Sequence, residues 1–143
     1  MRQLLAFVFA MLLGFAPSYA LADERDDAVA AARGIMDALA KGQFKDIWQT
    51  KTSKFFKEKV PSEETFLMNL SMGRNPLGAI KSSQLIDVAF STTDPGSGYT
   101  GRIYAVTFKN SYPAGSFYER IVVIRESDGL FRMSGVWGTP APQ

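Results

Sequence analysis

Few residue types in this sequence can do chemistry, and Asp87 is the first of them. It lies between Ile86 and Val88 in a run of alternating apolar residues, so burial in a pocket would make its carboxylate a candidate general base. The same alternation allows a second interpretation. Asp87 then points to solvent from the face opposite Ile86, Val88 and Phe90, and the period of two favours this interpretation.

Four further residues are candidates for holding a ligand. Tyr104 has a hydroxyl that could donate into a pocket, although buried tyrosines generally pack and bond a carbonyl. Arg120 and Trp137 are expected to face each other, either as a cation–π pair or with the guanidinium orienting an anion. Arg74 is expected to brace a turn by donating to carbonyls, with a ligand role as the alternative. The candidate ligand-binding residues are therefore Arg74, Asp87, Tyr104, Arg120 and Trp137.

The composition excludes several kinds of active site. The chain has no cysteine and no histidine, which excludes disulfides and thiol catalysis and removes the commonest general base and metal ligand. Gly96 and Gly98 flank a serine, but the lysine and the helix of a phosphate-binding loop are missing. The remaining residue types give no set of nucleophile, base and orienting group. We predict no catalytic residues, no metal site and no cofactor.

The charge balance argues against nucleic acid as a partner. Without Arg2, which falls in the signal predicted below, the 16 basic residues become 15, against 14 acidic ones. Both signs are mixed along the chain, and no basic block of the kind that follows a phosphate backbone is present.

Four stretches alternate apolar and polar residues as strands do, at 84–92, 102–109, 117–126 and 131–137. Asp128 and Gly129 between the last two suit a two-residue type I′ loop, because both positions need positive φ. Such a loop pairs Arg120 with Trp137, Val122 with Gly135 and Ile124 with Met133. This surface of the hairpin is expected to be the core side, and the surface with Val123 and Ser134 the more polar one.

Three helical segments are expected before the strands. Residues 28–42 repeat apolar side chains at helical spacing, residues 43–60 have a second apolar face with lysines on the solvent side, and Ser62 caps a third helix ending at Gly73. In that third helix the buried stripe is expected to be Phe66, Leu67, Leu70 and Met72. The order predicts an α+β fold, with N-terminal helices packed on a four-stranded, curved antiparallel sheet. This layout matches the NTF2-like or cystatin-like cone, which often encloses a pocket between helices and sheet.

The N-terminus reads as a secretory signal. Arg2 precedes an uncharged stretch at 4–16, Pro17 breaks it, and Ala20 and Ala22 form a small-x-small cleavage site. We predict cleavage after Ala22, with Ala20 as the second choice. The alternative, an uncleaved anchor, is disfavoured because the apolar run is shorter than the roughly 20 residues of a membrane span. The domain layout is then a signal peptide at 1–22, one α+β domain at 23–137 and a disordered tail at 138–143, in a periplasmic or secreted protein without a stable membrane anchor.

The chain resembles the bacterial family DUF4019, exported proteins of unknown function. The resemblance rests on an Ala-rich first helix, the segment Asp-Ile-Trp at 46–48, an Arg-x-Pro-Leu-Gly turn at 74–78 and the hairpin RESDGLFRMSG at 125–135. It covers most of the chain after the predicted signal. It implies a fold and a location in the cell envelope, and no reaction.

Three functions fit these observations. The first is a non-catalytic envelope domain that binds a small molecule or a partner protein. The second is an enzyme of NTF2-like fold that uses a pocket carboxylate, Asp87, as general base. The third is a structural or stress-related envelope protein. The sequence leaves the ligand, the partner and the oligomeric state undetermined, and it makes an enzyme less favoured than a binding module.

Overall fold

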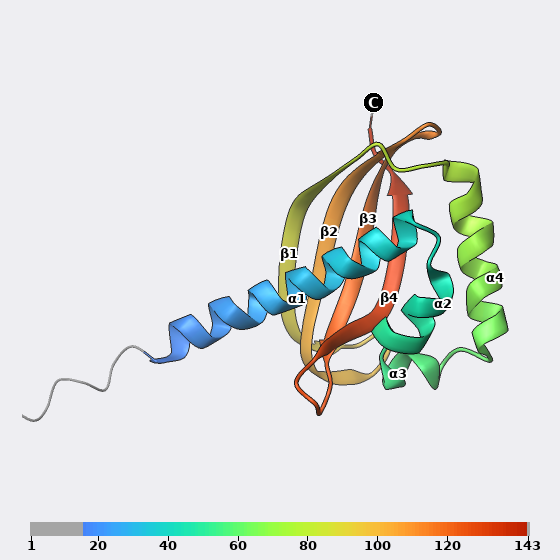
Figure 1. The fold of residues 1–143 in the computed structure, drawn as a ribbon. Coiled ribbons are helices and arrows are strands. Elements are labelled where there is room, and N and C mark those ends of the chain that lie inside the picture. The colour runs from blue at the N-terminus through green and yellow to red at the C-terminus, as the bar shows by residue number, and fades with distance from the viewer. Residues whose placement is uncertain (1–15, 143) are drawn as a thin grey trace, which may run out of the picture.

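The computed structural model describes residues 16–142, and it shows helices followed by a single sheet (Figure 1). The helical part consists of α1 (Ala16–Ala40), α2 (Phe44–Asp46), the π-helix η1 (Ile47–Lys51), α3 (Lys54–Lys57), α4 (Glu63–Arg74) and the 3-10 helix η2 (Asn75–Leu77). The strands are β1 (Ser82–Asp94), β2 (Tyr99–Tyr112), β3 (Gly115–Arg125) and β4 (Phe131–Pro140). The α+β fold class is confirmed. Among residues 16–142, no helix is both long and apolar enough to cross a bilayer.

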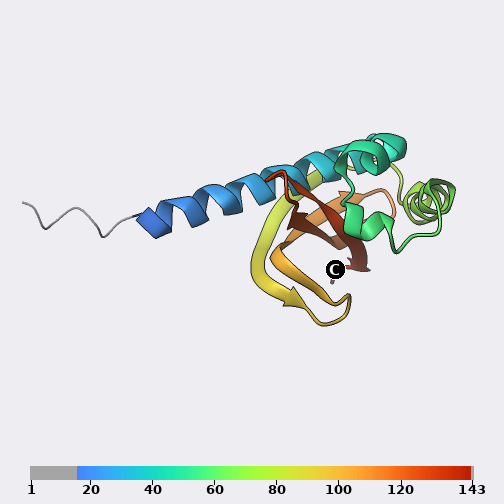
Figure 2. The ribbon, with the colours of Figure 1, turned by 90° about the horizontal axis from the view of Figure 1, so that it is seen from below.

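The four strands form an open antiparallel sheet in the order β1-β2-β3-β4. Each strand is paired with its neighbour in sequence, as expected for strands joined by short turns. The sheet is strongly curved, and the hairpin between β1 and β2 reaches round toward the segment after α3 (Figure 2). There Lys59 Nζ donates to the Ser97 carbonyl at 3.0 Å, and the rings of Phe55 and Tyr99 lie 4.9 Å apart.

Helix α1 crosses one face of the sheet and supplies most of the helical side of the core. Its buried positions follow the predicted helical spacing and include Ala32, Ile35, Met36 and Leu39. Gly42, with φ +67°, ends the helix as predicted. The helix begins earlier than residue 28, so the predicted cleavage site after Ala22 lies inside it. Most of the predicted signal, at residues 1–15, lies outside the described residues.

Helix α4 is capped as the sequence predicts. The Ser62 hydroxyl accepts from the Thr65 N–H at 3.1 Å, and the glutamates of the first turn face the positive end of the helix dipole. Phe66 and Leu70 are buried and Leu67 is half-buried. Met72 was expected in the same stripe, but it is 68% exposed, because the packed face of this helix, where Phe66 lies against Trp48 and Phe56, does not extend to it.

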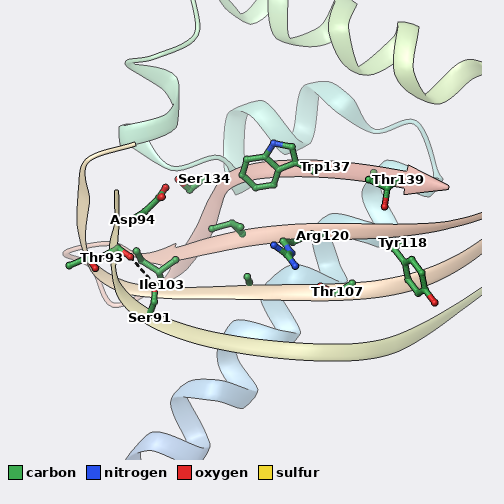
Figure 3. A pocket seen from close by; sticks show the side chains of 13 residues that line it. Ser91, Thr93, Asp94, Ile103, Thr107, Tyr118, Arg120, Ser134, Trp137 and Thr139 are labelled. Carbon is green, nitrogen blue, oxygen red and sulfur yellow. Dashed lines mark hydrogen bonds between the residues drawn. The ribbon is translucent and has the colours of Figure 1, made fainter. Parts of the chain in front are cut away.

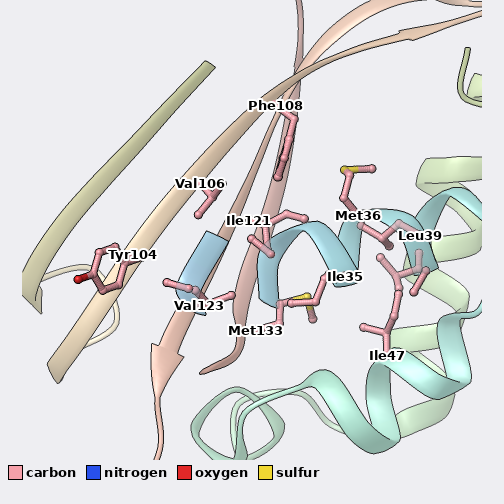
Figure 4. Close-up of a cluster of buried hydrophobic side chains, with 14 of the residues drawn as sticks. Ile35, Met36, Leu39, Ile47, Tyr104, Val106, Phe108, Ile121, Val123 and Met133 are labelled. Carbon is pink, nitrogen blue, oxygen red and sulfur yellow. The ribbon is translucent and has the colours of Figure 1, made fainter. Parts of the chain in front are cut away.

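The space between helices and sheet is filled by side chains (Figure 4). Met133, Ile121, Val123, Val106 and Phe108 from the strands pack against the buried residues of α1 and against Ile47. Close packing of this kind is what stabilises a domain without disulfides. The pocket expected between helices and sheet is therefore replaced by the core, and the cleft described below lies on the other face.

The hairpin between β3 and β4 differs from the predicted two-residue loop. Glu126 N–H donates to the Leu130 carbonyl at 2.9 Å, which leaves a three-residue loop whose last residue, Gly129, has φ +83°. A bulge beside Val123 then shifts the register. Arg120 pairs with Trp137 and Val122 with Gly135 as predicted, but Val123 pairs with Met133 and Ile124 with Arg132.

The predicted core side of this hairpin was wrong. Ile121, Val123 and Met133 face the helices, whereas Arg120, Val122 and Trp137 lie on the opposite face. The extra residue of the bulge moves Met133 to the helix side, because successive side chains alternate between faces.

Two further features of the strands differ from the sequence prediction, a bulge in β1 and the end of β4. A bulge in β1 between Leu85 and Asp87 leaves Ile86 46% exposed and puts Leu85 against the core. Strand β4 continues to Pro140, so residues 138–140 pair with Phe117, Tyr118 and Glu119. The predicted tail from 138 therefore starts with three strand residues, held by the backbone ladder of β3.

Candidate functional site

A cleft of about 580 Å³ lies on the face of the sheet opposite α1 (Figure 3). All four strands contribute to it, because the curvature of the sheet brings the end of β1 over β3 and β4. Its lining includes Ser91, Thr93 and Asp94 of β1, Ile103, Ala105 and Thr107 of β2, Tyr118, Arg120 and Val122 of β3, and Ser134, Trp137 and Thr139 of β4. A volume between 300 and 1,000 Å³ is typical of small-molecule sites.

The six-membered part of the Trp137 ring lies against Gly135 within this cleft. A Cβ atom built on Gly135 would come within 2.3 Å of Trp137 Cη2 and 2.7 Å of Cζ3. Only a residue without a side chain leaves room for the ring in this position. Trp137 remains 57% exposed, so one aromatic face is available to a ligand.

Arg120 projects into the middle of the cleft from the neighbouring strand. It pairs with Trp137 across β3 and β4, as predicted. The predicted cation–π pair does not form, because the Trp137 ring lies on Gly135 instead of beneath the guanidinium. Within residues 20–142, the Arg120 guanidinium makes no ion pair and no hydrogen bond with a protein group. Thr107 and Tyr118, which line the same part of the cleft, add hydroxyls beside it.

Asp94 lines the cleft at the end of β1, and the sequence analysis did not select it. Its carboxylate accepts from the Ser97 hydroxyl at 2.5 Å and from the Gly96 N–H at 3.1 Å. The Ser97 hydrogen bond, with smaller help from the backbone donors, holds the pKa of Asp94 below its usual value. The signal for it was present in the sequence, since Asp-Pro-Gly is a typical start for a turn in which Asp binds its own backbone.

Asp87 lies on the cleft face of the sheet without lining the cleft. It pairs with Thr107, which pairs with Arg120, which pairs with Trp137, so these four residues form one row across the strands. Asp87 is exposed, on the face opposite Val88 and Phe90. The general-base role predicted as the alternative needs a buried carboxylate, and this position does not provide one.

Arg74 belongs to a buried polar cluster on the helix side of the sheet. Its guanidinium pairs with Glu119 and donates to the Tyr112 hydroxyl at 2.7 Å. Glu119 also accepts from Tyr112 and from the Asn110 amide, and Asn110 and Glu119 are 0% and 4% exposed. Arg74 thus anchors the end of α4 to β2 and β3 through side chains, and not through the turn carbonyls as predicted.

This cluster is largely buried, and its role is structural. Burial, and then the hydrogen bond to Glu119, raises the pKa of Tyr112 to about 12, which keeps its hydroxyl a donor. Glu119 lies between Tyr118 and Arg120 in β3, so the cluster fixes the strand that carries these two cleft residues and Val122. Asn110 and Glu119 were missed because a polar residue in a strand is expected to face solvent unless its buried partner, here Arg74, is known.

Tyr104 also lies on the helix side, away from the cleft. Its hydroxyl donates to Glu24 Oε1 at 3.1 Å, and the same carboxylate pairs with Arg102 at 2.7 Å and Arg125 at 3.0 Å. Burial, and then the hydrogen bond to Glu24, raises the pKa of Tyr104. Of the five predicted residues, the structure therefore brings Arg120 and Trp137 together in the cleft and leaves Arg74 and Tyr104 in two separate polar clusters.

The cleft offers one cation, one carboxylate, several hydroxyls, an aromatic side chain and apolar walls. In the part of the chain that the structure describes, no three acidic side chains gather as they would around a metal ion.

Comparison with known proteins gives a family without an assigned activity. No curated protein and no solved structure matches the chain. The model of one family, described as "Protein of unknown function (DUF4019)", matches residues 31–136. The match runs from α1 into β4 and includes the segment at 46–48, the turn at 74–78, the hairpin at 125–135 and part of the Ala-rich first helix. The chain therefore belongs to the DUF4019 family.

Proposed function

We propose that this protein is a non-catalytic binding domain of the cell envelope, with its small-molecule site in the cleft on the open face of the sheet. The observation that carries the proposal is the exposed Trp137 ring held against Gly135, in the cross-strand pair with Arg120. An aromatic platform next to a cation that has no protein partner is an arrangement that core packing does not need. It is common in sites that hold a ligand by one face and one polar group.

The proposed location in the envelope comes from the N-terminal sequence. A basic residue, an apolar run and a small-x-small site support export and cleavage after Ala22. The layout of helices on one face of a curved sheet supports a relationship to the NTF2-like or cystatin-like cones, as a fold-level analogy that carries no reaction.

Expression of the full chain in a bacterium, followed by fractionation and N-terminal sequencing, tests the location. The expected product is periplasmic and begins at Asp23, or at Leu21 if the second site is used. Retention of the intact N-terminus in the cytoplasm would contradict the proposed export, while leaving the cleft proposal open to the next test.

A small-molecule screen on the processed protein tests the cleft. Binding is read from thermal stabilisation, because a ligand that binds the folded state alone raises the unfolding temperature. We expect Trp137→Ala to abolish the stabilisation by any hit. Met72→Ala, which removes another exposed apolar side chain, from α4, is the matched control. Hits that bind both variants equally well would place the binding site outside the cleft. They would then favour the alternative function, a structural protein of the envelope.

A further inference from the structure

We infer that the cleft selects an organic anion with a flat ring, the ring lying on Trp137 and the anionic group at Arg120. This inference names the ligand class of the proposed binding function and therefore rests on it. The charge pattern, the hydroxyls and the apolar walls of the cleft support it separately.

The charged side chains of the cleft favour an anion at Arg120. Arg120 and Asp94 are the charged side chains among the cleft-lining residues. Asp94 already accepts hydrogen bonds from its own turn, whereas Arg120 has no acidic partner within residues 20–142. A guanidinium that lines a cleft without a carboxylate favours an anion, because charge-assisted hydrogen bonds to carboxylate or sulfonate oxygens are about twice as strong as neutral ones.

Asp87 does not cancel this charge. It lies two strands away from Arg120 in the same row, with Thr107 between them. Two strand spacings separate their backbones by roughly 9–10 Å. This is about the screening length of physiological salt, so the interaction between two exposed charges at that distance is weak.

Hydroxyls line the whole cleft, and those near Arg120 can bind the anion together with the guanidinium. Thr107, Tyr118 and Thr139 line the part of the cleft around Arg120, and each can donate to an oxyanion (Figure 3). Asp94 lies at the other end of the cleft and repels a second negative charge there. The ligand therefore carries its charge at one end.

The apolar walls define the remainder of the ligand. Val122, Ile103 and Ala105 form the floor beside Trp137, and one face of the indole is open. A flat ring stacked on an indole is stabilised by more than its buried area alone, because the two π-systems attract each other. An aliphatic anion of the same charge would lose this contribution.

A pair of fluorescent probes tests the class on the processed protein. Anilinonaphthalene sulfonate is a flat aromatic anion, and N-phenyl-naphthylamine is the same ring system without the sulfonate. We expect the sulfonate to bind about tenfold or more tightly than the neutral probe, since one charge-assisted interaction is worth about 1.4 kcal/mol or more. Arg120→Gln should remove this difference by weakening the sulfonate alone. Arg25→Gln, at an exposed arginine outside the cleft, is the matched control and should change neither affinity.

Trp137→Ala should weaken both probes, and Gly135→Ala, which displaces the ring without removing it, gives a second variant if the first fails to fold. Equal binding of the two probes, lost in Trp137→Ala and unaffected by Arg120→Gln, would overturn the anion class and leave the binding function standing. Failure of both probes to bind, or binding that Trp137→Ala and Gly135→Ala leave unchanged, would overturn the binding function at this cleft together with the ligand class.

Discussion

At the scale of single residues, Gly135 is the position on which the cleft depends. Gly135→Ala would put a methyl group 2.3 Å from Trp137 Cη2, and the indole is the group that can move because its outer face is exposed. We expect the ring to swing away from the sheet while the fold is kept, with a loss of stability of about 1 kcal/mol or less. The near-ultraviolet circular dichroism of Trp137, measured in a Trp48→Phe background, should collapse.

Gly138→Ala is the matched control for this prediction, because it adds the same methyl group in the same strand. The nearest atom to that Cβ is Glu119 Cγ at 3.7 Å, an ordinary contact. An unchanged Trp137 signal in Gly135→Ala, or an equal change in both variants, would show that the indole does not lie where the structure has it.

Arg74 is the residue with the largest expected effect on stability. Arg74→Ala would leave the Glu119 carboxylate, with 5% of its side chain exposed, without its cation. Removing one partner of a buried ion pair typically costs about 3–5 kcal/mol, because the other charge remains buried. Urea unfolding should show this loss as a lower midpoint with the same slope.

The exposed pair of Arg25 and Asp26 provides the contrast, since Arg25→Ala breaks an ion pair whose side chains are 51% and 77% exposed. Its cost should stay below about 1 kcal/mol. Similar losses in the two variants would mean that the cluster around Glu119 is solvated in solution.

At the scale of elements, the docking of α1 on the sheet depends on Glu24. Burial alone would raise its pKa, but the hydrogen bonds and charges of Arg102, Tyr104 and Arg125 outweigh burial and hold the pKa of Glu24 below its usual value. A carboxyl whose pKa is depressed in the folded state stabilises that state above its unfolded pKa. This stabilisation is lost as the pH falls through the folded pKa.

We therefore expect the protein to be more stable than its Glu24→Gln variant at pH 7, and the difference to shrink below about pH 4. Chemical unfolding of both proteins from pH 7 to pH 3 measures it. Asp27→Asn, at an exposed acid of the same helix, should show no such convergence. If the difference in free energy of unfolding between Glu24→Gln and the unsubstituted protein does not change with pH, the docking of α1 does not depend on the ionisation of Glu24.

The elements also show what the sequence could and could not predict. The first and last long helices and the four strands followed from periodicity and turn residues, which are local. The pairing of Arg120 with Trp137 was predicted from a two-residue loop, and it holds because the longer loop and the bulge at Ser134 shift the register in opposite directions. The face of the hairpin was wrong because β3 has apolar residues on both faces, and because the bulge, which nothing in the sequence around Ser134 marks, moves Met133 to the helix side. The location of the cleft depends on the curvature of the whole sheet, and no local pattern encodes that.

At the scale of the whole molecule, alkaline pH should unfold the protein through Tyr112. Burial, and then the hydrogen bond to Glu119, raises the pKa of Tyr112 to about 12, whereas in the unfolded chain a tyrosine ionises near pH 10. Between these values the unfolded state releases a proton that the folded state keeps. The free energy of unfolding should therefore fall by up to about 1.4 kcal/mol per pH unit between pH 10 and 12 from this group.

Tyr112→Phe is expected to start from a lower stability, because it loses hydrogen bonds with Arg74 and Glu119, but to have a shallower slope above pH 10. Equal slopes in the two proteins, measured by urea unfolding at a series of alkaline pH values, would mean that other groups set the alkaline limit.

The packing of α1 on the last two strands determines when, during synthesis, the core can form. Helix α1, at the start of the described chain, packs on β3 and β4 at its end, and the Ser53 N–H donates to the Met133 carbonyl at 2.8 Å. No N-terminal portion that stops before β4 can bury the apolar face of α1 completely. A chain that emerges from a ribosome N-terminus first therefore cannot complete this core until its last strand has appeared.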